Sequence, residues 1–150
     1  MNTPQQLADK IEKSIPNIEK ALQGYEVLVI SDIDGAIKSR IFNKGESQKG
    51  KIGKYKNGKY KQKREDAGRQ TDYVDLQFTG ELNRSIQKGI KGDKQVVGFN
   101  NDGAAEIAEH LDEKYNKVIF APSSDELKDA IKTGETYMVQ QLTKIVQSWL

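Results

Sequence analysis

The sequence predicts an α+β fold in which helices pack on a small, mostly antiparallel sheet. Apolar residues recur at helical spacing near the start, in the middle and at the end of the chain, and two short stretches between them alternate apolar and polar residues as strands do. The chain has 150 residues, which is enough for one domain with an ordinary core. We therefore expect a single domain, residues 1–150, from which a basic arm protrudes at residues 44–68.

The first predicted helix begins near the N-terminus. Its apolar residues are spaced at three- and four-residue steps: Leu7, Ile11, Ile15, Ile18 and Leu22. We expect Pro16 to bend or restart this helix, because proline lacks the amide hydrogen that a helix interior needs. Gly24 is the residue expected to end it.

The stretch VLVISDIDGAIKSR, residues 27–40, allows more than one interpretation. Apolar residues running into Asp32 and Asp34 are what a haloacid-dehalogenase-type phosphatase places at the end of a strand. A helical projection, at about 100° per residue, instead puts the apolar residues on one face and the two aspartates beside it. The late acidic pair that would bind Mg²⁺ in such a phosphatase is also absent. A helix is therefore favoured over a phosphatase loop or a buried strand.

The middle of the chain is strongly basic. Residues 38–69 carry a net charge of +9 and the rest of the chain −7, and residues 44–68 offer almost no apolar side chain to bury. We expect an exposed arm that charge repulsion keeps extended, with a small hairpin turning at Asn57-Gly58. Its expected contact residues are Lys51, Lys54, Tyr55, Lys56, Lys59, Tyr60, Lys61, Lys63, Arg64 and Arg69.

Short strands are predicted after the arm. Val74, Leu76 and Phe78 alternate with polar residues, which predicts a half-buried strand closed by Thr79-Gly80. Residues 84–90 and 94–99 flank Gly92-Asp93 and predict a hairpin. A further short strand is expected at residues 117–120.

Helices complete the predicted fold. Asp102 can cap a helix that runs to Tyr115. Ser123 and Glu126 form a capping box that opens the next helix, and a last helix is expected after Gly134.

Four segments follow one another in a characteristic order: RIFNKGES (40–47), YKQKREDAGRQTDYVDLQFTGELNRSI (60–86), QVVGF (95–99) and KVIFAPSSDEL (117–127). This order resembles the tailed-phage virion-morphogenesis or tail-completion family, the small head–tail joining proteins that are also found in prophages. The similarity spans about residues 35–132. The residues that resemble the family's signature are Asp75, Leu76, Thr79, Gly80, Leu82, Ser85 and Ile86.

The resemblance implies a virion structural protein that completes the tail or joins it to the head. By family analogy it works as a homo-oligomeric ring, a hexamer, beside other neck and tail proteins, and is assembled in the cytoplasm of the host bacterium. No catalytic residue, metal or cofactor is implied, and no membrane span is expected.

Within such a ring, the basic arm of one subunit is expected to lie on the acidic segments 105–113 and 123–129 of the next. The alternative is a nucleic-acid-binding protein that uses the Tyr/Lys arm, with DNA binding the less favoured role. A phosphohydrolase is the third interpretation.

Overall fold

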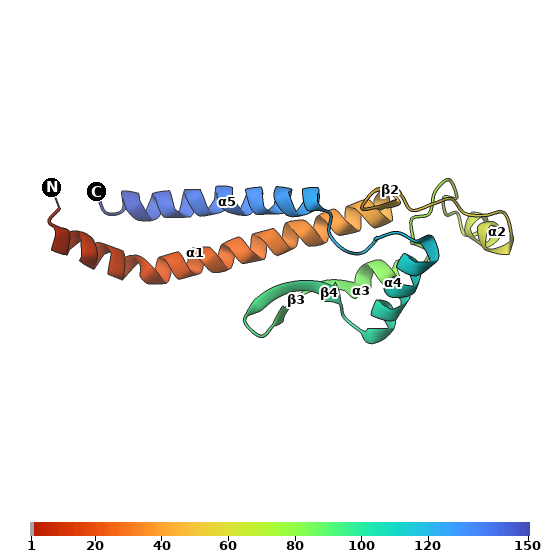
Figure 1. Ribbon diagram of the computed structural model, residues 1–150, viewed down its shortest axis with the longest axis horizontal. Helices are drawn as coiled ribbons and strands as arrows, with labels where there is room; N and C mark the ends of the chain where they lie inside the picture. Colours follow the sequence, from red (N-terminus) through yellow and green to blue (C-terminus); the bar gives the residue numbers. More distant parts are fainter. Residues whose placement is uncertain (1) are drawn as a thin grey trace.

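The computed structural model describes residues 2–150 and has the α+β fold that the sequence predicts (Figure 1). Two long helices, α1 (Pro4–Lys38) and α5 (Ser124–Gln147), run antiparallel. The chain termini lie together at one end of this pair, and the short helices and strands gather at the other end. We call residues 4–26 and 134–150 the rod, and residues 27–133 the head.

The elements of the head are short. They are η1 (Ser39–Asn43), β1 (Glu46–Ser47), β2 (Gly50–Lys51), α2 (Lys59–Asp66), α3 (Glu81–Ser85), β3 (Ile86–Lys91), β4 (Lys94–Phe99) and α4 (Asp102–Tyr115). Strands β1 and β2 form one antiparallel pair, and β3 and β4 form another in which Ile86 faces Phe99. The predicted hairpin at residues 84–99 is thus confirmed. It lies beside the C-terminal half of α1 (Figure 1).

Helix α1 is longer than predicted. Thr3 caps it, and Gln6 completes a capping box. Pro16 lies inside the helix. Its missing amide hydrogen accounts for the bend in α1 that Figure 1 shows, and the helix continues through this bend. The prediction that Gly24 ends the helix is wrong, because the apolar spacing continues through Val29, Ile33 and Ile37.

The prediction of a helix over residues 27–43 is confirmed, and α1 closes in the π-helical turn η1. This wider turn carries Arg40, Ile41 and Phe42, which are all buried. Asp32 and Asp34 consequently lie on a helix rather than at a strand end, and Asp34 pairs with Lys38, one turn along, at 3.0 Å. This placement contradicts the phosphatase interpretation, which needs the two aspartates at the end of a strand.

The helix expected at Ser123 and the one expected after Gly134 are a single helix, α5. Its capping box of Ser123 and Glu126 is confirmed. Gly134 lies inside this helix and packs closely against α1. A Cβ atom there would lie 2.6 Å from both Tyr25 Cε2 and Val29 Cγ2. The contact is reciprocal, since a Cβ at Gly24 would lie 2.3 Å from the Tyr137 hydroxyl oxygen.

Three predicted β elements, two strands and one hairpin, are not formed. Val74 and Asp75 are both buried, which an alternating strand cannot achieve, and Leu76 turns the chain away with a φ of 52°. The hairpin expected at residues 55–60 is replaced by the start of α2. Residues 117–120 form no strand, although Gln48 N donates to Val118 O at 2.9 Å. In addition, Asn101 rather than Asp102 caps α4, accepting from Ala104 N at 2.8 Å.

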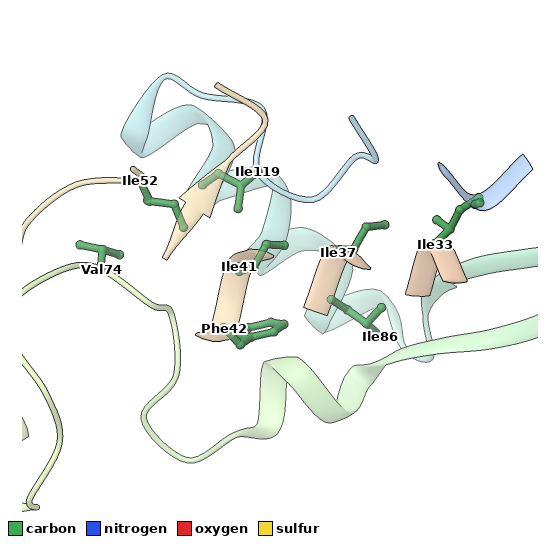
Figure 2. Close-up of a cluster of buried hydrophobic side chains, with 9 residues drawn as sticks. Ile33, Ile37, Ile41, Phe42, Ile52, Val74, Ile86 and Ile119 are labelled. Carbon is green, nitrogen blue, oxygen red and sulfur yellow. The ribbon is translucent and has the colours of Figure 1, made fainter. Parts of the chain in front are cut away.

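The hydrophobic core lies entirely in the head (Figure 2). Side chains from α1 and η1 meet others from the loops after β2, α2 and α4, from β3 and from α5. The cluster is aliphatic except for one phenylalanine and consists of Ile33, Ile37, Ile41, Phe42, Ile52, Val74, Ile86, Ile119 and Ala130. It joins segments that are far apart in sequence, so the head depends on α1 as its central element.

Gly134 and Gly35, which both lie inside helices, offer a matched test of the packing between α1 and α5. Gly134→Ala should lower the free energy of unfolding by about 1–2 kcal/mol, because overpacking against Tyr25 and Val29 outweighs the gain in helix propensity. Gly35→Ala lies in the same kind of backbone with no atom within 4 Å of its new Cβ, and should raise stability by about 1 kcal/mol. Urea unfolding followed by circular dichroism measures both, and equal effects would contradict the close packing.

Candidate interaction surface

The arm is organised around one buried arginine. Arg64 lies on α2 with none of its surface exposed. Its Nε donates to Gln70 O at 3.1 Å, its Nη1 donates to Gln77 O at 3.1 Å, and its Nη2 donates to both carboxylate oxygens of Asp75 at 3.0 and 3.3 Å. The guanidinium also stacks 4.3 Å from the centre of the Tyr55 ring. One side chain therefore holds α2 against the loop that follows it.

Asp75 accepts from three side chains. Besides Arg64, the Tyr55 hydroxyl donates to it at 3.0 Å and Gln70 Nε2 donates at 2.6 Å. Burial, followed by the charge of Asp75, raises the pKa of Tyr55, so this hydroxyl stays a donor across the physiological range. The buried charge of Arg64 is thus paired and its donors are satisfied, as a charge in a protein interior requires.

The expectation of an arm with nothing to bury is wrong. Ile52 and Arg64 are both buried, and residues 52–78 wrap around the Arg64–Asp75 pair. Charge repulsion between lysines does not keep the arm extended, because this pair and its carbonyl acceptors fold the chain back. Arg64 is accordingly an internal anchor and cannot be an outward contact residue.

The family-like signature forms a compact turn instead of a strand. Asp75 and Ile86 are buried, and Leu82 packs on the core. Gly80 is the N-cap residue of α3 and has a φ of 77°, the left-handed conformation that favours glycine. The hydroxyl of the preceding residue, Thr79, accepts from Glu81 N at 3.3 Å. The remaining members line the same turn: Leu76 packs beside the core and the Ser85 hydroxyl donates to Leu82 O at 2.7 Å.

The lysines of the arm divide into two groups. Lys51 donates to Lys44 O at 2.6 Å and lies over the Tyr73 ring, and Lys61 is half-buried and bonds Asn57. The others are exposed on or near α2, at the end of the head farthest from the rod (Figure 1): Lys54, Lys56, Lys59 and Lys63, with Arg69 beyond them. Of these, Lys63 also lies 5.2 Å from the centre of the Phe78 ring. These exposed cations are the ones available to a partner.

The tyrosines of the arm face inward. Tyr55 is held by Asp75, the Tyr60 ring lies between the rings of Tyr55 and Phe78 at 5.8 and 6.3 Å, and the Tyr73 hydroxyl donates to Asn43 O. Tyr60 keeps about half of its surface exposed. The rings of Tyr55, Tyr60 and Phe78 therefore pack on one another.

Beside these rings lies an apolar groove of about 500 Å³. Its lining comes from the arm, the signature turn and α4, and includes Tyr60, Leu76, Phe78, Leu82, Ile107 and Leu111. Ile107 contributes to this groove from α4, and 54% of its surface is exposed. This groove could not be predicted from a local sequence pattern, because its walls come from three segments that are distant in the sequence.

A second arginine, Arg40, joins the end of α1 to the start of α5 and to the segments between them. Its Nε donates to Glu126 Oε1 at 2.6 Å, its Nη1 to the carbonyls of Ile119 and Glu46 at 2.8 and 3.2 Å, and its Nη2 to Ala121 O at 3.0 Å. Sequence analysis missed this role. The available signal was an arginine at the end of the apolar face of α1, in IKSRIF.

The same contacts lower the pKa of Glu126, the ion-pair partner of Arg40. Burial raises the pKa of Glu126, but hydrogen bonds from the Arg40 guanidinium and from Ser123 outweigh it, so the pKa of this carboxyl lies below its usual value. Glu126 is thus engaged twice, as a helix cap and as an ion-pair partner.

The acidic segments expected to receive the arm are only partly free. Asp112 accepts from Ile119 N at 2.9 Å and Glu126 holds Arg40. The exposed carboxylates are Glu106, Glu109 and Glu113 on α4, with Asp125 and Asp129 on α5. His110 is also exposed on α4.

No protein-family model, curated protein or solved structure matches the chain. Within residues 2–150, no helix is both long and apolar enough to cross a membrane. In the same described part of the chain, no group of three or more His, Asp or Glu side chains is placed to hold a metal ion.

The Arg64–Asp75 pair predicts a large asymmetry between single and double substitution. Asp75→Ala should cost about 3–5 kcal/mol, because it leaves the guanidinium charge buried without its counter-ion. Arg64→Met combined with Asp75→Leu should recover most of that loss. Glu46→Ala, which removes an exposed 3.6 Å pair with Lys51, is the control and should cost under about 1 kcal/mol. Thermal unfolding that ranks Asp75→Ala with the control would show that the pair does not hold the arm.

The Arg40–Glu126 pair predicts that the contact between the end of α1 and the start of α5 loses stability in acid. A lowered folded-state pKa contributes stability that is present above the ordinary pKa and is lost as the pH falls through the folded value. Glu126→Gln should therefore be about 1–3 kcal/mol less stable than the wild type above about pH 5, and the difference should disappear toward about pH 3. Denaturant unfolding across this range measures it, with Glu113→Gln as the exposed control that tracks the wild type. A difference that grows on acidification would contradict this assignment.

Proposed function

We propose that the chain is a structural subunit of a tailed-phage or prophage virion, a tail-completion or head–tail connector protein that works in a homo-oligomeric ring. The proposal is carried by the ordered resemblance over about residues 35–132. The fold supports it because Asp75, Gly80 and Ile86 of the signature are structural, fixing a turn at the centre of the head. Such a subunit would be assembled in the host bacterial cytoplasm and would contact other neck and tail proteins.

The surface charges support a head-to-tail contact between subunits. Exposed lysines project from the α2 end of the head, and exposed carboxylates lie along α4 and the first turns of α5. A heterologous contact between two different patches of the same chain closes into a ring when the rotation allows it. Opposite charges steer such an encounter and fix its register.

The proposed role requires no reaction, cofactor or metal of this chain. Asp32 and Asp34 lie on α1, where neighbouring positions on a helix point in different directions. Asp34 is paired with Lys38. We therefore propose a structural protein rather than an enzyme.

Nucleic-acid binding is the second candidate, favoured by the exposed Lys54, Lys56, Lys59 and Lys63. Stacking of bases on the arm is less well supported, because Tyr55 and Tyr73 are held by Asp75 and Asn43 O. A purely electrostatic contact with DNA phosphates would remain, and it would weaken steeply with salt.

Reversal of the exposed lysines tests the proposal. We expect Lys54→Glu, Lys56→Glu, Lys59→Glu and Lys63→Glu together to abolish ring assembly while changing the melting temperature little, since none of the four is buried. Sedimentation velocity and negative-stain microscopy read the assembly state. The matched control reverses Lys13, Lys20, Lys91 and Lys94, exposed lysines on α1 and on the β3–β4 hairpin, and should leave rings intact.

Rings that survive the arm reversal would contradict the arm contact. Binding of duplex DNA by the wild type, with log K falling by about 0.9 per phosphate contact for each unit of log salt, and without self-association, would favour the nucleic-acid role instead.

A further inference from the structure

The interior of the rod is made of small residues. Where α1 and α5 face each other, the buried positions are Ser14, Ala21 and Gly134. The Tyr25 ring lies over Gly134 and the Tyr137 ring over Gly24. None of the core cluster belongs to residues 4–26. The rod thus brings its two helices close together but buries few of its large aliphatic side chains between them.

Those aliphatic side chains are exposed instead. On α1 the exposed fractions are 41% for Leu7, 45% for Ile11, 46% for Ile15 and 48% for Leu22, and on α5 they are 38% for Leu142 and 47% for Val146. Scattered exposed leucines are ordinary on a protein surface. Six of them along one pair of helices form a continuous patch, and such patches mark interaction sites.

Helix geometry places both rows on the same side of the rod. At about 100° per residue, the α1 row lies roughly a quarter turn from the line of Ser14 and Ala21, which faces α5. The α5 row lies a similar quarter turn from Gly134. Because the two helices are antiparallel, these two rotations carry both rows to one face. We call this face, with Leu7, Ile11, Ile15, Leu22, Leu142 and Val146, the rod face.

The rod face continues a surface that the chain itself already covers. Further along α1, the same helical row reaches Val29, Ile33 and Ile37, where Ile33 and Ile37 are buried in the core cluster with Ile86 of the hairpin. The hairpin lies along the C-terminal half of α1 and ends before its N-terminal part (Figure 1). The hairpin and the core therefore cover the C-terminal half of this α1 row, and its N-terminal half is exposed.

The size of the rod face matches a specific interface. Twenty-three residues of α1 span about 34 Å, and two helices side by side are about 20 Å across, which gives roughly 700 Å². Each partner in a stable protein–protein interface contributes about 800 Å². Lys13 and Lys20 lie on the opposite side of α1, and the six residues that define the rod face are uncharged. Glu135 falls in the α5 row of Leu142 and Val146 at the end nearest the head, and the rest of the face selects a partner by apolar fit rather than by charge.

We propose that the rod face binds the rod face of a second copy of this chain, so that two rods form a four-helix bundle. An uncharged aliphatic face is complementary to another of the same shape, and a two-fold axis satisfies both copies with one set of contacts. The second copy supplies the layer of large side chains that the two-helix rod lacks. This pairing does not depend on the virion role, because a dimer outside any virion would satisfy it.

The test uses full-length protein carrying the four arm reversals, so that contacts of the arm do not contribute. Sedimentation equilibrium should give the mass of two chains. Adding Ile15→Gln and Leu22→Gln should raise the dissociation constant by at least about 100-fold. Adding Lys13→Gln and Lys20→Gln instead, on the opposite side of α1, should leave it unchanged. Trp149 is the sole tryptophan and donates to Ser14 Oγ at 2.9 Å, so its unchanged fluorescence shows that the rod is intact.

Cysteine crosslinking gives an independent readout, because the chain has no cysteine. Ile15→Cys should form a disulfide-linked dimer on mild oxidation, and Lys20→Cys should not. A mass of one chain at all concentrations, an Ile15→Gln/Leu22→Gln protein that still pairs, or equal crosslinking of the two cysteine variants would each overturn the proposal. Loss of rings on arm reversal together with retained pairing would separate this inference from the proposed function.

Discussion

The arrangement of the whole molecule depends on how the Arg40 guanidinium is satisfied. Its acceptors come from Glu126 at the start of α5 and from carbonyls of Glu46, Ile119 and Ala121. A buried cation demands such a shell, since each unsatisfied donor would cost free energy. The shell brings together the end of α1, β1, the link from α4 and the beginning of α5. The aliphatic core beside it is non-directional, so the arginine supplies the geometry that the core alone would leave open.

Arg64 plays the corresponding role in the arm, and the two arginines explain why a chain rich in lysine can fold there. The guanidinium offers donors in a planar fork that suits carboxylates and carbonyls, whereas lysine is a strongly hydrated point charge. Accordingly Lys54, Lys56 and Lys59 remain in solvent while Arg64 is enclosed. The basic stretch is therefore an ordered structure with a charged exterior.

Local patterns in the sequence predicted those parts of the fold that local physics controls. The helical row along α1, the Ser123–Glu126 capping box and the Gly92-Asp93 hairpin were all predicted, because each depends on residues that are close in sequence. The errors arose where distant contacts override a local pattern. The alternation of Val74, Leu76 and Phe78 suggests a strand, but pairing of Asp75 with Arg64 turns this segment into a loop. Gly134 suggests a break, but its contact with Tyr25 requires a glycine inside a helix. For the candidate surface, the exposed lysines were predictable from charge, whereas the groove and the Arg40 contacts were not, because both join segments that are far apart in the sequence.

Helix α1 passes without interruption from the tip of the rod to the core of the head. Its 35 residues make a lever about 52 Å long. A stiff lever of this kind turns a rotation of a few degrees at the core into a displacement of several ångströms at the tip. Whatever occupies the tip therefore also fixes the angle at which the head is held, so that orientation, and not only attachment, is set at the end of the molecule that lies farthest from α2.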